Sequence, residues 1–446
     1  MVERERIIVE CLDFNHQGQG VCKPNSFPIF VDFLLIGEIA EIEIIKLTKN
    51  YGFGKILKLI KVSADRVKPP CPAFGKCGGC EIMHMRYDAQ LAFKQQMGIN
   101  TLKKIAHLRN LPVSGIVGMD QPFYYRNKVQ IPFQKVKNQV ICGFFKKNSH
   151  EIFPMERCFI QPELATKIAL FVGNLMNQYQ IPAYDEERQS GCLRHVLIRS
   201  NSKNEFMLVL VTNTKELPHA NQLIKSLQNE FPLIKTIIQN INNEKTNVVL
   251  GKKNLVHMGS GFLREELLGL TFAVSPHSFF QTNYEQTSKL YRQVLKYANP
   301  QLTDVIVDGY CGVGTIAVFL ARFCKRVVGI EIVKEAVQDA RANALLNNIS
   351  NVEFIVGKTE EEIYKFSLGE INILIIDPPR KGCAPQLLQA IIEKQIPKIV
   401  YVSCNVATLA RDLAFLSSNY EIKDVTFFDM FPQISDVEIC VLLQIT

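Results

Sequence analysis

Apolar and polar positions alternate in short runs over about the first 60 residues, and glycine turns separate the runs. Ile29-Phe-Val-Asp32 and Glu38-Ile-Ala-Glu-Ile-Glu-Ile44 are two of them. A period of two is typical of strands that bury one face. Residues 1–60 are therefore expected to form a small five-stranded β-barrel.

A different pattern extends from residue 256 to residue 446. Fully apolar runs, such as Val305-Ile-Val307, Ile373-Leu-Ile-Ile376 and Ile399-Val-Tyr-Val402, alternate with stretches of helical spacing. Such runs are typical of parallel strands that are buried on both faces. We predict a Rossmann-like α/β domain over residues 256–446.

The intervening residues, 61–255, contain further alternating segments and a cluster of cysteines, and we expect them to form a central α+β domain. The segment Phe123-Tyr-Tyr-Arg126-Asn-Lys128 combines aromatic, guanidinium and amide groups. Arg126 and Lys128 are candidates for contact with a nucleic acid, although such residues also occur on structural strands.

A glycine turn, Asp308-Gly-Tyr-Cys-Gly312-Val-Gly314, follows the first apolar strand of the Rossmann-like domain and leads into a helix. Glycines let the backbone approach a ligand closely, and the helix start supplies free N–H groups. The next strand ends in Glu331, which can accept hydrogen bonds from ribose hydroxyls. NAD is an alternative ligand, but Asp308 would repel its pyrophosphate and can accept from an ammonium group. The pattern favours S-adenosylmethionine.

Two later strands end in potentially reactive sequence. Asp377-Pro-Pro-Arg380 follows one strand and Ser403-Cys404-Asn405 follows the next, and ligands of open α/β sheets bind at such ends. Cys404 is a candidate nucleophile, although a free cysteine in isolation usually packs as a small apolar residue. Because a free thiol has a pKa of about 8.5, either a nearby donor or the amino end of the following helix should favour its thiolate.

These motifs together resemble the class I methyltransferases that form 5-methyluridine in RNA. More specifically, the chain resembles the family that methylates uracil C5 in 23S ribosomal RNA and carries an iron–sulfur cluster. The resemblance covers nearly the whole chain and includes Ser275-Pro-His-Ser-Phe-Phe-Gln281-Thr-Asn283 and Val437-Glu438. The first 60 residues resemble the TRAM module, which implies that the barrel binds RNA.

The resemblance implies roles for residues of the catalytic domain. Cys404 would add to C6 of uracil as the nucleophile, and Glu438 would remove the C5 proton. The implied contacts to S-adenosylmethionine are Gln281, Tyr310, Thr315, Glu331 and Asp377. The chain also departs from the family at three positions. Family members usually have Thr and His shortly before the base, where this chain has Ile434 and Asp436, and Asp or Asn near adenine, where it has Lys358.

Cys71, Cys77 and Cys80 form a second motif, in which two glycines separate Cys77 from Cys80. Thiols at this spacing can converge on one inorganic centre. Zinc is an alternative because four thiolates also suit a tetrahedral structural site. The resemblance implies a [4Fe–4S] cluster with Cys158 as the fourth ligand, serving in fold support or RNA contact.

Three other functions fit parts of the pattern. Cytosine-C5 methyltransferases usually place a cysteine beside proline after the fourth strand, whereas Asp377-Pro-Pro-Arg380 has none. Transfer-RNA uracil methyltransferases are closer, but they usually lack the barrel and the cysteine cluster. A non-catalytic RNA-binding iron–sulfur factor in ribosome assembly is the third alternative, because of the departures at positions 358, 434 and 436.

The composition agrees with an RNA partner. The chain has 51 Lys and Arg against 43 Asp and Glu, a net charge of +8, which favours binding to a polyanion without selecting its sequence. The 13 cysteines have no regular framework, and neither a signal segment nor a membrane-spanning apolar stretch is found. We expect a cytoplasmic monomer that holds its target uridine turned out of the RNA stack.

Overall fold

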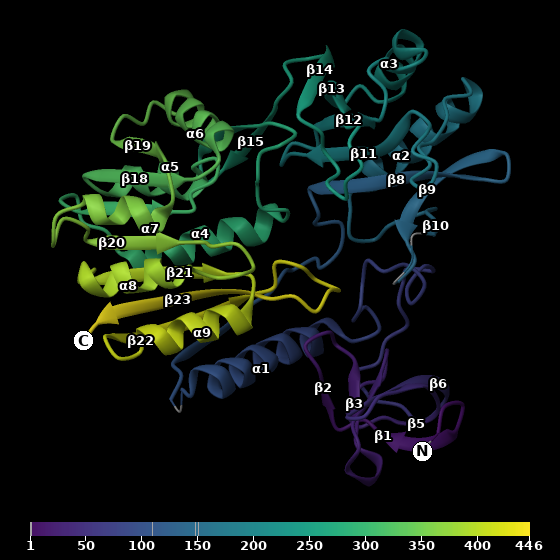
Figure 1. Ribbon diagram of the computed structural model, residues 1–446, viewed down its shortest axis with the longest axis horizontal. Helices are drawn as coiled ribbons and strands as arrows, with labels where there is room; N and C mark the ends of the chain where they lie inside the picture. Colours follow the sequence, from purple (N-terminus) through teal and green to yellow (C-terminus); the bar gives the residue numbers. More distant parts are fainter. Residues whose placement is uncertain (1, 109, 148, 150) are drawn as a thin grey trace.

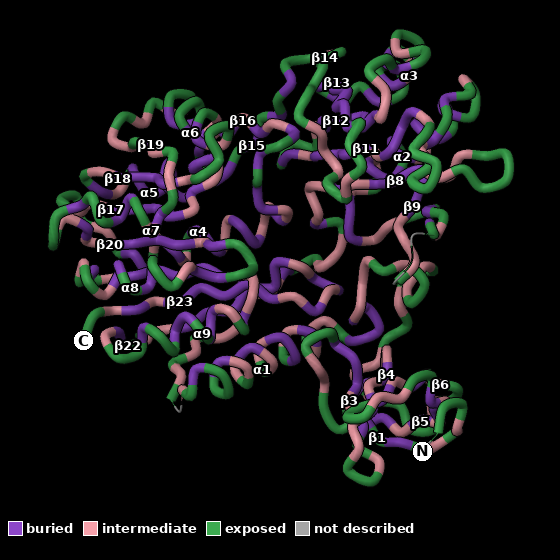
Figure 2. Tube along the Cα trace, in the orientation of Figure 1, coloured by how far each residue is buried: buried purple, intermediate pink, exposed green. Residues whose placement is uncertain are grey.

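The computed structural model describes residues 2–108, 110–147, 149 and 151–446. An amino-terminal barrel, a central sheet with helices and a large helix-covered sheet follow one another along the chain (Figure 1). The buried segments lie mainly in the strands of these bodies and the exposed ones at loops and outer helix faces (Figure 2). Within the described ranges, no helix is both long and apolar enough to cross a membrane.

The amino-terminal barrel has the strand order β1-β5-β6-β4-β3-β2. Its strands are β1 (Arg6–Glu10), β2 (Asp13–Phe14), β3 (Gly20–Cys22), β4 (Ile29–Val31), β5 (Ile39–Leu47) and β6 (Gly52–Lys61), with a 3-10 turn, η1, at Pro24–Ser26. Only Cys11 and Leu12 separate β1 from β2, which pair at opposite ends of the sheet and so close it. The six strands correspond to the five predicted because the first is broken at Cys11.

The central sheet has the order β10-β9-β8-β11-β12-β13-β14 and is antiparallel except where β12 pairs with β13. Its elements are β8 (Lys128–Val136), β9 (Gln139–Phe145), β10 (Ile152–Pro154), α2 (Glu163–Gln178), β11 (Leu193–Ser200), β12 (Phe206–Thr212), α3 (Ala220–Glu230), β13 (Ile234–Ile241) and β14 (Lys253–Met258). Helices α2 and α3 share one apolar core with this sheet.

The large sheet has the order β19-β18-β17-β20-β21-β23-β22-β7. Its elements include β17 (Val305–Gly309), β18 (Arg326–Glu331), β19 (Val352–Val356), β20 (Ile373–Ile376), β21 (Lys398–Ser403), β22 (Tyr420–Phe428) and β23 (Glu438–Ile445). The helical segments are α4 (Tyr284–Ala298), α5 (Thr315–Leu320), η2 (Ala321–Phe323), α6 (Lys334–Leu346), α7 (Thr359–Glu362), η3 (Ile363–Lys365), α8 (Pro385–Glu393) and α9 (Val406–Leu416). A hairpin, β15 (Leu263–Leu267) and β16 (Leu270–Val274), precedes this domain. Strands β17 to β21 are parallel, whereas β23 is antiparallel to both neighbours.

Two elements from before residue 124 complete the large domain. β7 (Val113–Val117) pairs in parallel with β22, and α1 (Tyr87–Ala106) packs against α9. Lys94 of α1 and Asp429 form a fully buried ion pair, and Tyr87 Oη donates to the same carboxylate at 2.8 Å. Helix α1 and strand β7 therefore pack with the large domain, although residues 61–255 are expected to form the central domain.

Candidate active site

The ends of neighbouring strands bring the predicted residues to one edge of the large sheet. Asp377 follows β20, and Cys404 follows β21. Because β23 runs antiparallel to β21 and Ile439 pairs with Ser403, Glu438 lies opposite Cys404. The topology thus brings together two side chains that are distant in the sequence.

The Cys404 thiol is partly buried among carboxyl groups. Burial, Glu438 and Asp377 raise its pKa to about 12, whereas the Arg380 guanidinium lowers it. The Asn405 side chain caps α9 by accepting from the N–H groups of Ala407 and Thr408. Those helix N–H groups are already paired, so Arg380 is the nearby donor that favours the thiolate.

An ion pair fixes Arg380 beside Cys404. Arg380 Nη2 lies 2.5 Å from Asp436 Oδ2. The carbonyl oxygen of Arg380 also accepts from Asn405 Nδ2 at 3.1 Å and from Thr408 Oγ1 at 3.2 Å. Sequence reasoning missed this pair, because 56 positions separate Arg380 from Asp436 and neither carries a local signal for it.

Replacing Arg380 with Met should raise the pKa of the Cys404 thiol further and slow its alkylation at every pH below that pKa. The positive charge is lost, whereas the backbone carbonyl that holds Asn405 and Thr408 remains. Alkylation by iodoacetamide between pH 7 and 10, followed by mass spectrometry of the Cys404 peptide, measures the effect. Lys381→Met is the matched control, and equal alkylation of both variants would contradict the assignment.

Three carboxyl groups lie at this end of the sheet, and two of them, Glu438 and Asp308, are buried. Glu438 is 2 % exposed, and burial, then Asp377 and Asp436, raise its pKa well above its usual value against the opposing effect of Arg380. Burial raises the pKa of Asp377 to about 7. Burial and Asp377 also raise the pKa of Asp308, and its Oδ2 atom has no hydrogen-bond partner among the described residues. A positively charged ligand would relieve this repulsion.

The glycine turn after β17 has a backbone conformation that favours glycine. Gly312 and Gly314 have φ angles of 55° and 78°. A Cβ atom at Gly314 would lie 2.7 Å from the Phe354 ring, so a larger residue does not fit. Glu331 Oε2 accepts from the Gly312 N–H at 3.1 Å, which places this carboxylate beside the turn.

The other residues implied in cofactor binding surround the same turn. Tyr310 lies in it with a φ angle of 63°, and Thr315 begins α5, with its Oγ1 atom 2.7 Å from Tyr291 Oη. Gln281 Nε2 lies 3.5 Å from Asp377 Oδ2. These contacts join the start of α5 to α4, and the segment before α4 to the end of β20.

Lys358 lies just before α7, where an adenine contact is expected in relatives. Its Nζ atom is 2.7 Å from Glu361 Oε1, and about half of its side chain is exposed. Since a lysine has no acceptor, this side chain cannot take a hydrogen bond from the adenine amino group.

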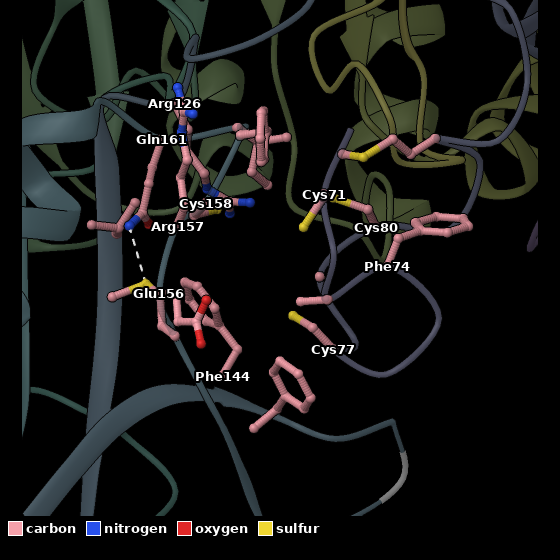
Figure 3. A pocket seen from close by; sticks show the side chains of 18 of the residues that line it. Cys71, Phe74, Cys77, Cys80, Arg126, Phe144, Glu156, Arg157, Cys158 and Gln161 are labelled. Carbon is pink, nitrogen blue, oxygen red and sulfur yellow. Dashed lines mark hydrogen bonds between the residues drawn. The ribbon is translucent and has the colours of Figure 1, made fainter. Parts of the chain in front are cut away.

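The four predicted cysteine ligands line a second site, a cavity of about 750 Å³. Cys71, Cys77 and Cys80 come from one loop, residues 71–80, and Cys158 comes from the segment before α2 (Figure 3). Burial raises the pKa of Cys80 well above its usual value, and the charges of the other three thiols raise it further. Burial also raises the pKa of Cys158 to about 11.

The expected metal centre is not confirmed by this arrangement. Over residues 2–108, 110–147, 149 and 151–446, no group of three or more His, Cys, Asp or Glu side chains is arranged to hold a metal ion. The four thiols instead lie around the cavity, near enough to influence one another's protonation.

Three aromatic side chains lie together on the barrel. The Phe30, Tyr51 and Phe53 rings lie 5.6 to 5.9 Å apart. Tyr51 is exposed, and Phe30 is only partly buried. Clustered aromatic rings are a common surface for stacking single-stranded bases.

Comparison with known proteins agrees with the fold and with an RNA methyltransferase. Residues 124–446 match the family model described as tRNA (uracil-5-)-methyltransferase, and residues 2–57 match the TRAM domain. An uncharacterized RNA methyltransferase of Oceanobacillus iheyensis is 46% identical over 96% of this chain and 94% of its own length. A similar protein of Clostridium acetobutylicum is 42% identical over 97% of this chain and 95% of its own length.

A solved structure has the same architecture. The Pyrococcus abyssi tRNA (uracil-54, C5)-methyltransferase, in complex with S-adenosyl-L-homocysteine, superposes with a TM-score of 0.78. It is 28% identical to this chain, covering 98% of it and 99% of the other. The predicted resemblance is thus confirmed, and the chain belongs to the family of S-adenosylmethionine-dependent RNA (uracil-C5)-methyltransferases that carry an amino-terminal TRAM domain.

Proposed function

We propose that this enzyme methylates C5 of a uridine in 23S ribosomal RNA, with Cys404 as nucleophile and Glu438 as base. The observation that carries the chemistry is the meeting of Cys404, Asp377 and Glu438 at adjacent strand ends. The choice of ribosomal RNA rests on the resemblance of the sequence motifs. The basic composition and the aromatic group on the barrel support binding to RNA.

S-adenosylmethionine supplies a methyl group on a positively charged sulfonium, and the buried carboxyl groups suit that charge. We assign Gln281, Tyr310, Thr315, Glu331 and Asp377 to its binding. Negative charge on Asp377 and Asp308 would be stabilised by the sulfonium and ammonium groups. Ligand binding would also weaken the repulsion that now raises the pKa of Cys404.

The proposed reaction needs one bond to form and break at Cys404. Its thiolate adds to C6 of uracil, and the electron pair gained at C5 attacks the methyl carbon, whose bond to the sulfonium sulfur breaks so that S-adenosylhomocysteine leaves. Glu438 then takes the C5 proton, the C5–C6 double bond reforms and the thiolate leaves. Glu438 must be ionised for this step, which again requires cationic ligand charge to offset its burial.

The test is a methyl-transfer assay on unmodified 23S ribosomal RNA and, in parallel, on bulk transfer RNA. Mass spectrometry of the digested RNA identifies the modified nucleoside. 5-Methyluridine in ribosomal RNA alone is the expected result. Methylation of neither RNA would contradict the proposal and favour a non-catalytic RNA-binding role.

Transfer RNA is a second candidate substrate because of the Pyrococcus abyssi structure. That tRNA enzyme aligns over 98% of this chain, which includes the barrel. The barrel therefore does not separate the two substrate classes, contrary to the expectation from sequence. Methylation of transfer RNA alone would keep the chemistry and replace the proposed substrate.

We further propose that Cys71, Cys77, Cys80 and Cys158 hold a [4Fe–4S] cluster. Four thiols that line one cavity provide the right donors. The five-residue gap between Cys71 and Cys77 and the family resemblance favour a multi-iron cluster over one tetrahedral zinc ion. Iron would also stabilise the thiolates that burial disfavours.

Replacing Cys77 with Ser should remove most of the iron and the brown absorbance of anaerobically purified protein. A hydroxyl is a poor substitute for a thiolate ligand, so the cluster loses one of its four anchors. Visible spectroscopy and metal analysis measure the result, with Cys192→Ser as a matched control at a cysteine outside the cavity. A colourless wild-type protein that contains zinc would contradict the cluster.

A further inference from the structure

The β22–β23 loop, residues 429–437, leads directly into Glu438, and distant side chains hold it. Its backbone carbonyl groups are bound from three separate elements. The contacts are Asn283 Nδ2 to Met430 O at 3.0 Å, Lys94 Nζ to Phe431 O at 2.9 Å and Tyr125 Oη to Pro432 O at 3.0 Å. The first half of the loop is thus fixed before its chain reaches the base.

Glu81, which directly follows Cys80, holds the second half of the loop. Glu81 Oε2 accepts two hydrogen bonds from Ser435, from its N–H at 2.8 Å and its Oγ at 3.2 Å. The N–H groups of Glu81 and Ile82 donate to the Gln433 carbonyl at 3.0 and 3.2 Å. Ser435 is only 5 % exposed, so water cannot readily replace the carboxylate.

Ser435 lies between this contact and the catalytic groups. The next residue, Asp436, pairs with Arg380 beside Cys404, and Glu438 follows two positions later. A shift of Ser435 would therefore move the partner of Arg380 and the start of β23 together. The two carbonyl contacts of Arg380 would still hold the segment that carries Cys404.

We propose that Glu81 is a positioning residue for proton removal, acting through Ser435 on Asp436 and Glu438. This inference rests on the proposed function, because it takes Glu438 as the base that removes the C5 proton. It adds that a side chain next to the cysteine cavity sets the geometry of one catalytic step. Addition of Cys404 to uracil and methyl transfer depend on it less, since Cys404 follows β21.

The variants separate the side-chain contact from the backbone contacts. Glu81→Ala removes both acceptor interactions with Ser435 and keeps the two N–H groups that bind Gln433. Glu81→Gln retains an acceptor oxygen of the same reach and is the conservative variant. Ser435→Ala removes only the hydroxyl bond and carries the test if Glu81→Ala does not fold. Asp88→Ala, an exposed carboxylate that pairs with Arg86, is the matched control.

The experiment is a single-turnover reaction of full-length protein with methyl-labelled S-adenosylmethionine and the RNA that the wild type methylates. Denaturing gels then separate methylated RNA bound to protein from released RNA. With Glu81→Ala, label should enter the covalent adduct only slightly more slowly, because the Arg380 backbone keeps its contacts beside Cys404, whereas release slows about 10²-fold, as expected for a small displacement of a reacting group. Glu81→Gln should restore release, Ser435→Ala should slow it less, and Asp88→Ala should match the wild type.

The outcomes distinguish this inference from the function on which it depends. Equal slowing of adduct formation and release, or no change in either, would overturn the role of Glu81. Retention of the adduct by Glu438→Gln in the same assay would leave the proposed chemistry intact. Absence of both adduct and 5-methyluridine with the wild type would instead overturn the proposed function.

Discussion

The Cys404→Ala variant is expected to lose methyl transfer by more than about a thousandfold while binding RNA with unchanged affinity. Without the thiol, no covalent bond to C6 forms, and C5 stays too poor a nucleophile to attack the methyl group. The side chain lies at the end of a rigid buried strand, so its truncation leaves the RNA surface in place. Single-turnover methylation and a gel-shift titration measure the two quantities.

A covalent trap provides the control for this loss. RNA with 5-fluorouridine at the target should form a stable adduct with wild-type protein, because fluorine cannot leave as a proton does. Mass spectrometry should place the adduct on the Cys404 peptide, and Cys404→Ala should give none. Methyl transfer by Cys404→Ala at the wild-type rate would contradict the assignment of Cys404 as the nucleophile.

The Glu438→Gln variant is expected to slow product release by about 10² to 10⁴-fold, the usual range for a general base, and to accumulate methylated RNA bound to protein. Gln has nearly the same shape but cannot accept the C5 proton. Because the carboxyl group is buried and lies opposite Cys404, a proton acceptor from the solvent cannot replace it. The fraction of methyl label in the adduct after one turnover measures the effect.

Glu421→Gln on β22 is the matched control, because it changes an exposed carboxylate in the neighbouring strand. It should release product like the wild type. A Glu438→Gln variant that neither slows release nor retains the adduct would show that another group removes the proton.

The sequence predicts the position of reactive residues wherever the signal is local. Apolar runs that end in Asp377 and Cys404 marked two strand ends, and the glycine turn marked a third. Parallel strands align these ends at one edge, so their proximity follows from topology alone. The TRAM match over residues 2–57 likewise agrees with the alternation seen in the first 60 residues.

Contacts between distant segments carried no such signal. Arg380 meets Asp436 across 56 positions, and Glu81 meets Ser435 across 354. An isolated acidic residue beside a cysteine motif reads as a solvated side chain until the fold brings its partner close. The same reason hides the burial of Glu438, because alternation along β23 does not reveal that β21 and β22 flank it on both sides.

The placement of α1 and β7 also limits where the chain can be divided. A fragment that starts at residue 256 would leave β22 as an unpaired edge strand and uncover the face of α9 that α1 contacts. Exposed edges of this kind promote intermolecular pairing, and Asp429 would lose its ion-pair partner Lys94. The Rossmann-like part therefore depends on chain made before the central sheet, and during synthesis the large sheet is complete only after β23, which joins β22 and β7 to β21, has emerged.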